Sequence, residues 1–218
     1  MHLIKVGGGA EINLSGIVAD LAELDTPFVV VLGANALRDE IGQKLGLEKQ
    51  ELTSVSGYKS VYSDESAIDL IMMAYAGLRN RRFVELCQRY GINAVGLTGL
   101  DGRMVQGQRN RGIRVREGGK TLLKHDFSGK PKSANTDLLR LLLEQGYRPV
   151  LSIPIVDEQG FAINSENDDI VNVLQKSLHA EKILQLIEAP GFLDQRDDPE
   201  SVVRQMTQHE LEARENQV

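Results

Sequence analysis

A lysine beside a run of glycines is the most informative chemical feature of this chain. Residues 3–6 are apolar except for Lys5, as in a buried strand, and Gly7, Gly8 and Gly9 follow directly. Glycine lets backbone N–H groups approach an anion closely, and lysine supplies a compact positive charge. The pattern indicates a strand end that holds a nucleotide phosphate. The alternative is an exposed lysine before an ordinary glycine turn.

A second polar run, residues 164–169, follows an apolar stretch and precedes a helical pattern. Asp168 and Asp169 could simply complement the N-terminal dipole of that helix. Taken with Lys5, however, the run suggests phosphoryl transfer to a small acidic acceptor. Such a reaction needs positioning and cationic stabilisation more than covalent help from the protein. A carboxylate cannot contact phosphates favourably, so the sensible role for Asp168 is to hold a lysine in place.

Composition narrows the class of protein. The chain has 218 residues, of which 41% are hydrophobic and 26% charged, as in soluble globular proteins. We find no apolar run long enough to span a bilayer and no signal peptide. Cys87 is the single cysteine and lies in an apolar helical pattern, so we expect a core residue and a cytoplasmic protein. The net charge of −6 argues against nucleic acid as a partner. The four histidines lack metal-ligand spacing, so no metal site of the protein is expected.

Strand and helix patterns alternate along the chain. Buried strands are expected at 2–6, 28–32, 93–97, 149–155 and 183–187, with helices at about 10–24, 35–46, 64–90, 133–145 and 169–179. This order predicts an α/β fold, a three-layer α/β/α sandwich with a mainly parallel central sheet. The polar tail is expected to be helical near 199–214.

The stretch 101–132 has a different pattern. Short alternating runs surround a glycine turn, which predicts a β-hairpin region projecting from the main sheet. The stretch is strongly basic, and Arg111, Arg114 and Arg116 stand out within it. This hairpin could be an ordinary solvated element or a docking surface for an acidic partner.

Several motifs occur in an order typical of one family. They are Lys5-Val6-Gly7-Gly8, the strand–glycine–helix unit at 29–35, residues 76–80, residues 146–150 and Asn164 to Asp168. On these motifs the chain resembles the amino acid kinase family, in its acetylglutamate kinase branch. Residues 94–103 and the basic hairpin favour the subgroup that phosphorylates aminoadipate or glutamate attached to a small acidic amino-group carrier protein.

The resemblance implies specific roles. Lys5 would stabilise the transferring phosphoryl group and Asp168 would orient catalytic lysines. The acceptor would be bound by Gly33, Ala34, Lys59, Val61 and Asn164, and the nucleotide by Gly7, Gly8, Glu188 and Gly191. The cosubstrate would be ATP with Mg²⁺, held mostly by the phosphates and water. The product would be an acyl phosphate of lysine or arginine biosynthesis.

The chain departs from the family pattern in three places. Leu32-Gly33-Ala34-Asn35 stands where the family has His-Gly-Gly-Gly, so a methyl group enters the second glycine turn. Val61 stands where an arginine would clamp the acceptor, and Lys59 is a possible replacement. The chain ends at Val218, before a second catalytic lysine is expected. The resemblance thus predicts an acceptor-binding lobe at 1–150 and an incomplete nucleotide lobe at 151–218, inactive alone.

Two alternatives to the carrier-linked kinase stay open. One is an acetylglutamate kinase acting on the free small molecule, and the other is a non-catalytic binding protein with a degenerate kinase site. A homodimer through the 64–90 helix is also expected, since Met72, Met73 and Tyr75 widen its apolar face.

Overall fold

The computed structural model describes residues 1–47, 49–55, 57, 59–195 and 197–215. The chain forms two compact units, residues 1–186 and 187–218. The first holds almost all regular structure. Strand β10 passes through residue 150, so the boundary predicted there does not coincide with the division between the compact units. Which lobe binds which substrate stays a prediction.

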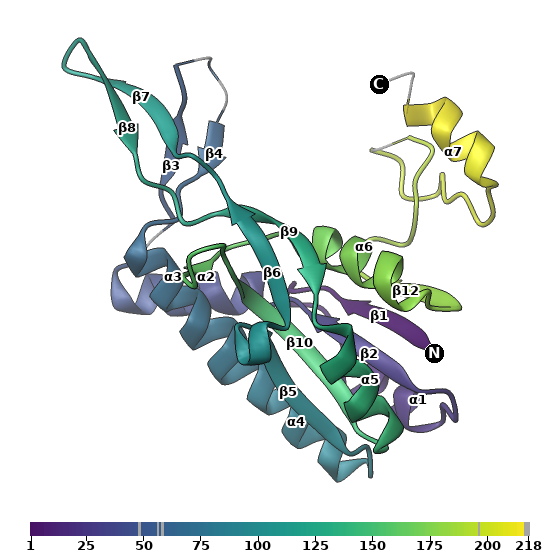
Figure 1. The fold of residues 1–218 in the computed structure, drawn as a ribbon. Coiled ribbons are helices and arrows are strands. Elements are labelled where there is room, and N and C mark those ends of the chain that lie inside the picture. Colours follow the sequence, from purple (N-terminus) through teal and green to yellow (C-terminus); the bar gives the residue numbers. More distant parts are fainter. Residues whose placement is uncertain (48, 56, 58, 196, 216–218) are drawn as a thin grey trace. The chain divides into compact units, whose positions relative to one another are not determined.

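The centre of the first unit is a curled, mostly parallel sheet with the order β12-β1-β2-β10-β6-β9 (Figure 1). Its strands are β1 (His2–Val6), β2 (Phe28–Leu32), β5 (Ala94–Gly99), β6 (Val105–Arg109), β9 (Gly129–Ala134), β10 (Arg148–Val156), β11 (Ala162–Ile163) and β12 (Lys182–Leu186). Strand β10 pairs in parallel with β2, β5 and β6. The predicted α/β architecture with a mainly parallel central sheet is confirmed.

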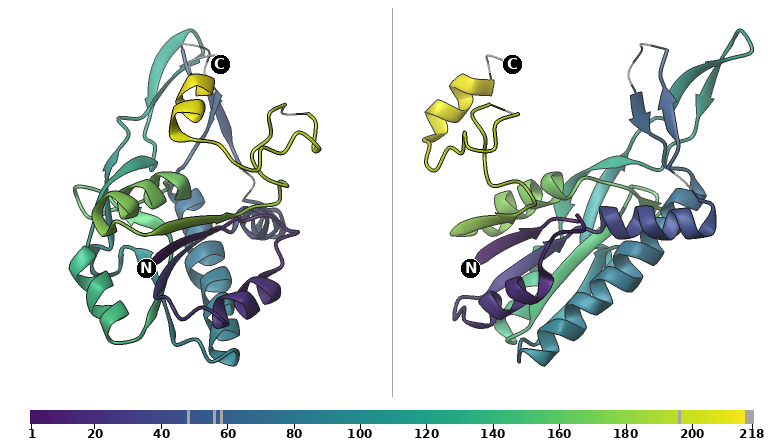
Figure 2. Two further views of the ribbon diagram at one scale, coloured as in Figure 1. Left: turned by 90° about the vertical axis from the view of Figure 1, so that its right-hand side faces the viewer. Right: turned by 180° about the vertical axis from the view of Figure 1, so that it is seen from behind.

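Helices cover both faces of this sheet (Figure 2). They are α1 (Leu14–Ala22), α2 (Asn35–Leu45), α3 (Glu65–Ile71), the π-helical segment η1 (Met72–Arg79), α4 (Asn80–Arg89), the 3₁₀ turn η2 (Asp101–Arg103), α5 (Thr136–Glu144) and α6 (Asn167–Leu178). Alternate side chains of the strands point to opposite faces. Accordingly Ile4 and Val30 pack in one buried cluster with α1 and α4, whereas Leu3 and Val31 pack in another with α5 and α6.

Two antiparallel hairpins project from the sheet. The predicted basic hairpin is β7 (Ile113–Glu117) with β8 (Lys120–Lys124). Beside it lies a hairpin that the sequence did not predict, β3 (Glu51–Thr53) with β4 (Lys59–Val61) (Figures 1 and 2). The Val55 N–H donates to the Arg114 carbonyl at 2.8 Å and joins the two.

Some predicted elements differ from the observed ones. The expected 64–90 helix is continuous, but its middle, Met72–Arg79, is a π-helix. Residues 133–134, expected to begin a helix, end strand β9, because they pair with β6. The tail prediction was wrong over 199–207, where Val202 pairs with Leu193 across a β-bridge; the helix α7 spans Gln208–Glu215.

The second unit consists of an irregular segment and α7. Among the described residues, no helix combines the length and the apolar character needed to cross a bilayer.

Candidate active site

The structure brings the two predicted catalytic residues into direct contact. Lys5 lies on β1, and its Nζ is 2.6 and 2.8 Å from the two carboxylate oxygens of Asp168. Asp168 sits in the first turn of α6, where a negative charge complements the helix dipole. The Lys5 side chain is 14% exposed and that of Asp168 58% exposed. The amine is therefore fixed in position while its carboxylate partner stays open to solvent.

Two glycine turns meet beside this pair. They follow β1 and β2, and their backbones touch: a Cβ on Gly8 would lie 2.6 Å from the Ala34 nitrogen, and a Cβ on Gly33 would lie 2.6 Å from the Gly8 nitrogen. The Gly33 N–H donates to the Val6 carbonyl at 2.8 Å. Glycine is thus required at both positions by the close approach of two backbones.

One predicted phosphate contact is restricted by this arrangement. The Gly7 N–H donates to the carbonyl of Leu186 on β12 at 2.8 Å, and the Gly8 carbonyl accepts from Ala36 at 2.9 Å. The Gly7 N–H is therefore already used within the sheet. The nucleotide-binding roles of Gly7 and Gly8 stay predictions.

The methyl group of Ala34 fits the second turn. Its backbone has φ −150°, which any L residue adopts, and its side chain is fully buried in the core. The whole residue, backbone included, is 0% exposed, and the predicted contact of Ala34 with an acceptor stays a prediction. The following residue, Asn35, begins α2 and accepts a short hydrogen bond from the hydroxyl of Tyr75 on η1. This bond ties the start of α2 to the π-helical segment.

Asn164 belongs to a network that the sequence did not reveal. Its Nδ2 lies 3.3 Å from the hydroxyl of Ser63, and the Ser63 N–H donates to the carboxylate of Asp126 at 3.0 Å. Asp126 is only 3% exposed and also accepts from the Ser128 hydroxyl. A buried carboxylate with several donors is a rigid anchor. No local motif marks these residues, since they come from three distant loops.

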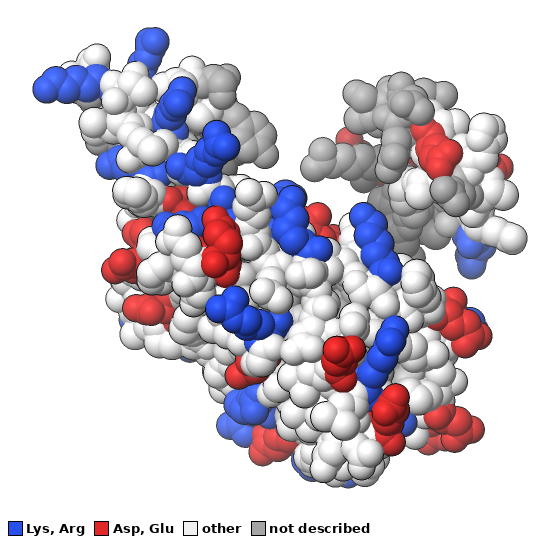
Figure 3. Space-filling view, in the orientation of Figure 1, with Lys and Arg blue, Asp and Glu red and all other residues white. Residues whose placement is uncertain are grey.

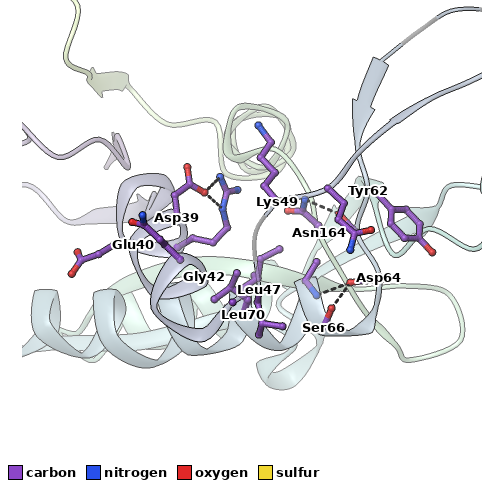
Figure 4. Close-up of a pocket in the computed structure, with 17 residues that line it drawn as sticks. Asp39, Glu40, Gly42, Leu47, Lys49, Tyr62, Asp64, Ser66, Leu70 and Asn164 are labelled. Carbon is purple, nitrogen blue, oxygen red and sulfur yellow. Dashed lines mark hydrogen bonds and ion pairs between the residues drawn. The ribbon is translucent and has the colours of Figure 1, made fainter.

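Asn164 and Ser63 line a cavity of about 440 Å³ between α2, α3 and the segments that lead into β3 and out of β4 (Figure 4). Tyr62, Asp64 and Lys49 line it too, as does Arg38 on α2. Gly33 and Ala34 are not among the lining residues. The cavity thus mixes apolar wall, amide and hydroxyl groups with basic and acidic side chains.

Three further groups of predicted site residues belong to other elements of the chain. Lys59 and Val61 lie on β4, but their side chains are outside the part of the structure that is described. Glu188 and Gly191 belong to the second compact unit. Arg114 and Arg116 are exposed on β7 of the basic hairpin, and Arg111 is exposed just before that strand. Basic side chains gather in this region (Figure 3). Their predicted functions stay predictions.

Two further predictions concern Cys87 and metal-binding side chains. Cys87 is fully buried, and burial raises its pKa to about 12, so the thiol is a core group. Within the described ranges, no group of three or more His, Cys, Asp or Glu side chains is arranged to hold a metal ion.

Solved structures share this fold. A crystal structure of smu.665 from Streptococcus mutans superposes with a TM-score of 0.72 at 15% identity, covering 99% of this chain and 82% of that one. An isopentenyl phosphate kinase superposes with a TM-score of 0.58 at 16% identity, covering 92% of this chain and 76% of that one. At such identities the likeness concerns the fold.

Sequence relatives are closer. A LysW-aminoadipate kinase of Deinococcus radiodurans is 36% identical over 98% of this chain and 74% of its own length. The LysW-aminoadipate kinase of Thermus thermophilus is 35% identical over 97% of this chain and 80% of its own length. An acetylglutamate kinase of Methanopyrus kandleri is 30% identical over 97% and 81%.

These relatives confirm the branch and the subgroup to which the motifs pointed. The match to the family itself, described as "Amino acid kinase family", covers residues 2–218. The predicted class of enzyme, a kinase, is confirmed with it. This chain belongs to the amino acid kinase family.

Proposed function

We propose that the chain is an ATP-dependent kinase that phosphorylates the side-chain carboxylate of aminoadipate or glutamate while the amino group of that acceptor is attached to a small acidic carrier protein. The observation that carries the proposal is the Lys5–Asp168 pair in a chain 36% identical to a LysW-aminoadipate kinase. The reaction would serve lysine biosynthesis, and arginine biosynthesis if the acceptor is glutamate.

The geometry supports a definite division of labour. A carboxylate oxygen of the acceptor attacks the γ-phosphorus of ATP, and the bond between that phosphorus and the oxygen bridging to the β-phosphate breaks. The products are ADP and the acyl phosphate of the acceptor. Charge develops on the transferring group, and a preorganised ammonium stabilises it without having to reorganise. Lys5 supplies that ammonium. Asp168 carries the wrong charge to contact phosphate, so it acts by holding Lys5 in place.

The ammonium group of Lys5 at the end of β1 suits a nucleotide phosphate. The N–H groups of Gly7 and Gly33 already donate within the sheet, so in this proposal Gly8 is the glycine of the first turn whose N–H would contact phosphate. Mg²⁺ would neutralise the phosphates and be held by them and by water. Asn164, anchored through Ser63 and Asp126, would hold the main-chain end of the acceptor.

The acidic carrier would dock on the basic hairpin. Arg111, Arg114 and Arg116 are exposed there, and opposite charge steers association. A homodimer through the helical stretch 65–89 and action in the cytoplasm remain parts of the proposal. Of the residues expected to widen the apolar face, Met73 is 42% exposed, whereas Tyr75 is buried at 2% and cannot contribute. Leu78, which is 44% exposed, adds apolar surface that was not predicted.

Acyl phosphate formation tests the proposal directly. The natural full-length protein is given ATP with carrier-linked aminoadipate, carrier-linked glutamate or free acetylglutamate, and the acyl phosphate is trapped with hydroxylamine. We expect kcat/KM to be at least about 100-fold higher on a carrier-linked acceptor. Equal or better turnover of free acetylglutamate would favour the acetylglutamate kinase alternative. Failure to bind ATP would favour the non-catalytic binding protein.

A further inference from the structure

Arg38 is a basic residue of the cavity wall to which the sequence motifs assign no role. It lies on α2, its side chain is 19% exposed, and it lines the same cavity as Asn164. Its Nε and Nη2 both donate to one oxygen of the adjacent Asp39, at 2.8 and 2.7 Å (Figure 4, dashed lines at Asp39). The guanidinium is therefore oriented in the wall of the cavity.

The guanidinium has donors to spare. Arginine carries five N–H donors, and Asp39 takes two of them. Among the described residues we find no second acceptor for Arg38. The Asp39 side chain is 57% exposed, so solvent screens its charge. A carboxylate that enters the cavity can therefore bind the N–H donors of Arg38 that Asp39 leaves.

The charge of Arg38 also acts on the phenol of Tyr75, a residue of η1. Burial raises the pKa of the Tyr75 phenol most, the Arg38 charge lowers it, and the Glu166 charge raises it. Both charges therefore act at one phenol, and Glu166 is the N-cap of the helix that carries Asp168 in its first turn. Asn164, which lines the cavity together with Arg38, precedes this N-cap by two residues, so the cavity lies near the start of α6.

The proposed acceptor needs such a cation. Aminoadipate or glutamate joined to a carrier through its amino group keeps two carboxylates, one that reacts and one that does not. Val61 stands where the resemblance expects an arginine for the second one. Of the described residues that line the cavity, Arg38 and Lys49 are the basic ones. The Lys49 side chain is 44% exposed and that of Arg38 19% exposed, and of the two only Arg38 has a planar fork, so Arg38 is the better placed.

We propose that Arg38 binds the non-reacting carboxylate of the acceptor, in place of the arginine that is absent at position 61. The inference rests on the proposed function and adds a specificity-determining residue to it. A guanidinium can bind a carboxylate through two parallel hydrogen bonds, which fixes the acceptor in orientation as well as in position. Asn164 would bind the same end of the acceptor from the opposite side of the cavity.

The test pairs a change in the protein with a change in the acceptor. KM and kcat are measured for carrier-linked aminoadipate and for the same compound with its α-carboxylate converted to a carboxamide. With the natural full-length enzyme, we expect the carboxamide to raise KM on the order of 10- to 100-fold, the value of a charge-assisted hydrogen-bonded pair. With Arg38→Gln the two acceptors should have nearly equal KM, and kcat should stay within a few-fold. Arg38→Lys should give an intermediate ratio.

Lys44→Gln is the matched control. Lys44 lies on the same helix, and its side chain is 69% exposed and paired with Glu40. It should keep the wild-type ratio between the two acceptors. If Arg38→Gln raises KM equally for both acceptors, its role is structural and the inference is wrong. The inference is also wrong if the ratio is lost in Lys49→Gln or Lys59→Gln and retained in Arg38→Gln.

Failure of the proposed function gives a different result. In that case the wild-type protein forms no acyl phosphate with either acceptor. The same comparison is then made by calorimetry, as the ratio of the two dissociation constants. A ratio that is large in the wild type and lost in Arg38→Gln supports the Arg38 site even then, and an absence of discrimination in the wild type overturns it.

Discussion

At the scale of single residues, the pairing of Lys5 with Asp168 is the central feature. The two are 163 residues apart in the chain, yet their charged groups are in contact. The lysine is largely enclosed and the carboxylate is open, so solvent reaches the pair from the Asp168 side. An amine held in this way is preorganised for a developing negative charge.

Replacing this lysine should abolish most of the catalysis without unfolding the protein. Lys5→Met keeps the length and the apolar stem of the side chain and removes the charge. We expect kcat to fall by about 10²–10³-fold, the usual effect of losing one group that stabilises the transition state. Steady-state kinetics of acyl phosphate formation measures this, with circular dichroism to verify the fold.

A second lysine–aspartate pair provides the control. Lys130 on β9 lies 2.6 Å from Asp169, the neighbour of Asp168 on α6, and its side chain is 64% exposed. Lys130→Met removes a comparable ion pair and should leave kcat within a few-fold. If both substitutions lower kcat equally, the special role of Lys5 is wrong.

The glycine turns make a prediction about stability. An alanine methyl at Gly8 would meet the backbone nitrogen of Ala34 at 2.6 Å, and backbone cannot yield as a flexible side chain does. We expect Gly8→Ala to lower the free energy of unfolding by about 1–3 kcal/mol, as overpacking does in a core. Urea denaturation measures this difference.

Gly77 is the matched control for this substitution. It lies inside η1, and its Cβ would meet nothing closer than a carbonyl oxygen at 3.4 Å. Because alanine is favoured over glycine inside helices, Gly77→Ala should be neutral or stabilise by up to about 1 kcal/mol. A Gly8→Ala protein as stable as the wild type would contradict the close approach of the two turns.

At the scale of elements, the two projecting hairpins define one end of the sheet. Alternation along β7 puts Arg114 and Arg116 on one exposed face, while Val115 between them is 4% exposed. The hydrogen bond from Val55 to Arg114 fixes this strand against the segment that follows β3. The basic face therefore has a defined orientation, which a docking surface requires.

Reversing the charge of this face should weaken carrier recognition. For Arg114→Glu combined with Arg116→Glu, we expect KM for the carrier-linked acceptor to rise about tenfold or more at low salt, while KM for ATP is unchanged. The difference should shrink as salt rises, because exposed charges are screened. Arg140→Glu on α5, which also removes an exposed arginine, should have no such effect. An unchanged, salt-independent KM in the hairpin variant would exclude docking at this face.

At the scale of the whole molecule, two buried clusters on opposite faces of the sheet hold the first unit together. Phe83 and Cys87 join α4 to the cluster that contains Ile4 and Val30. Leu174 joins α6 to the cluster that contains Leu3 and Val31. The central strands are thus buried on both sides, as the continuous apolar runs of the sequence predict.

The buried thiol gives this core a dependence on alkaline pH. Burial raises the pKa of Cys87 to about 12 from a usual 9.0. Between these values the unfolded chain loses the thiol proton and the folded chain retains it. The unfolded state then binds fewer protons, so the free energy of unfolding falls as pH rises from 9 towards 12.

Comparison with Cys87→Ala isolates this contribution, because all other titrating groups are shared. Urea midpoints of the two proteins are measured at pH 8 and pH 10.5. We expect the wild type to lose more stability than Cys87→Ala over this interval. Equal losses would mean that the folded and unfolded thiols titrate alike.

The sequence could predict the parts of this protein that depend on local patterns. Apolar runs predicted the β1, β2, β5, β10 and β12 strands to within about two residues. The prediction that the last of these is buried was wrong, since Ile183 and Leu184 on β12 are 40% and 39% exposed at the edge of the sheet. Turn residues located the β7–β8 hairpin. By contrast, β3 and β4 are three-residue strands that exist only through pairing with each other, and the segment 199–207 is held by a bridge between Leu193 and Val202.

The sequence by itself determined the α/β order and the two glycine turns, because periodicity and residue type are local. That Lys5 and Asp168 act together was implied by the resemblance of its motifs to the amino acid kinase family. Only the tertiary structure decided that Gly8 meets Gly33, that Asp126 and Ser63 anchor Asn164, and that Arg38 lines the same cavity. These contacts join segments far apart in the chain, and their formation depends on how the helices pack on a curled sheet, which no local pattern records.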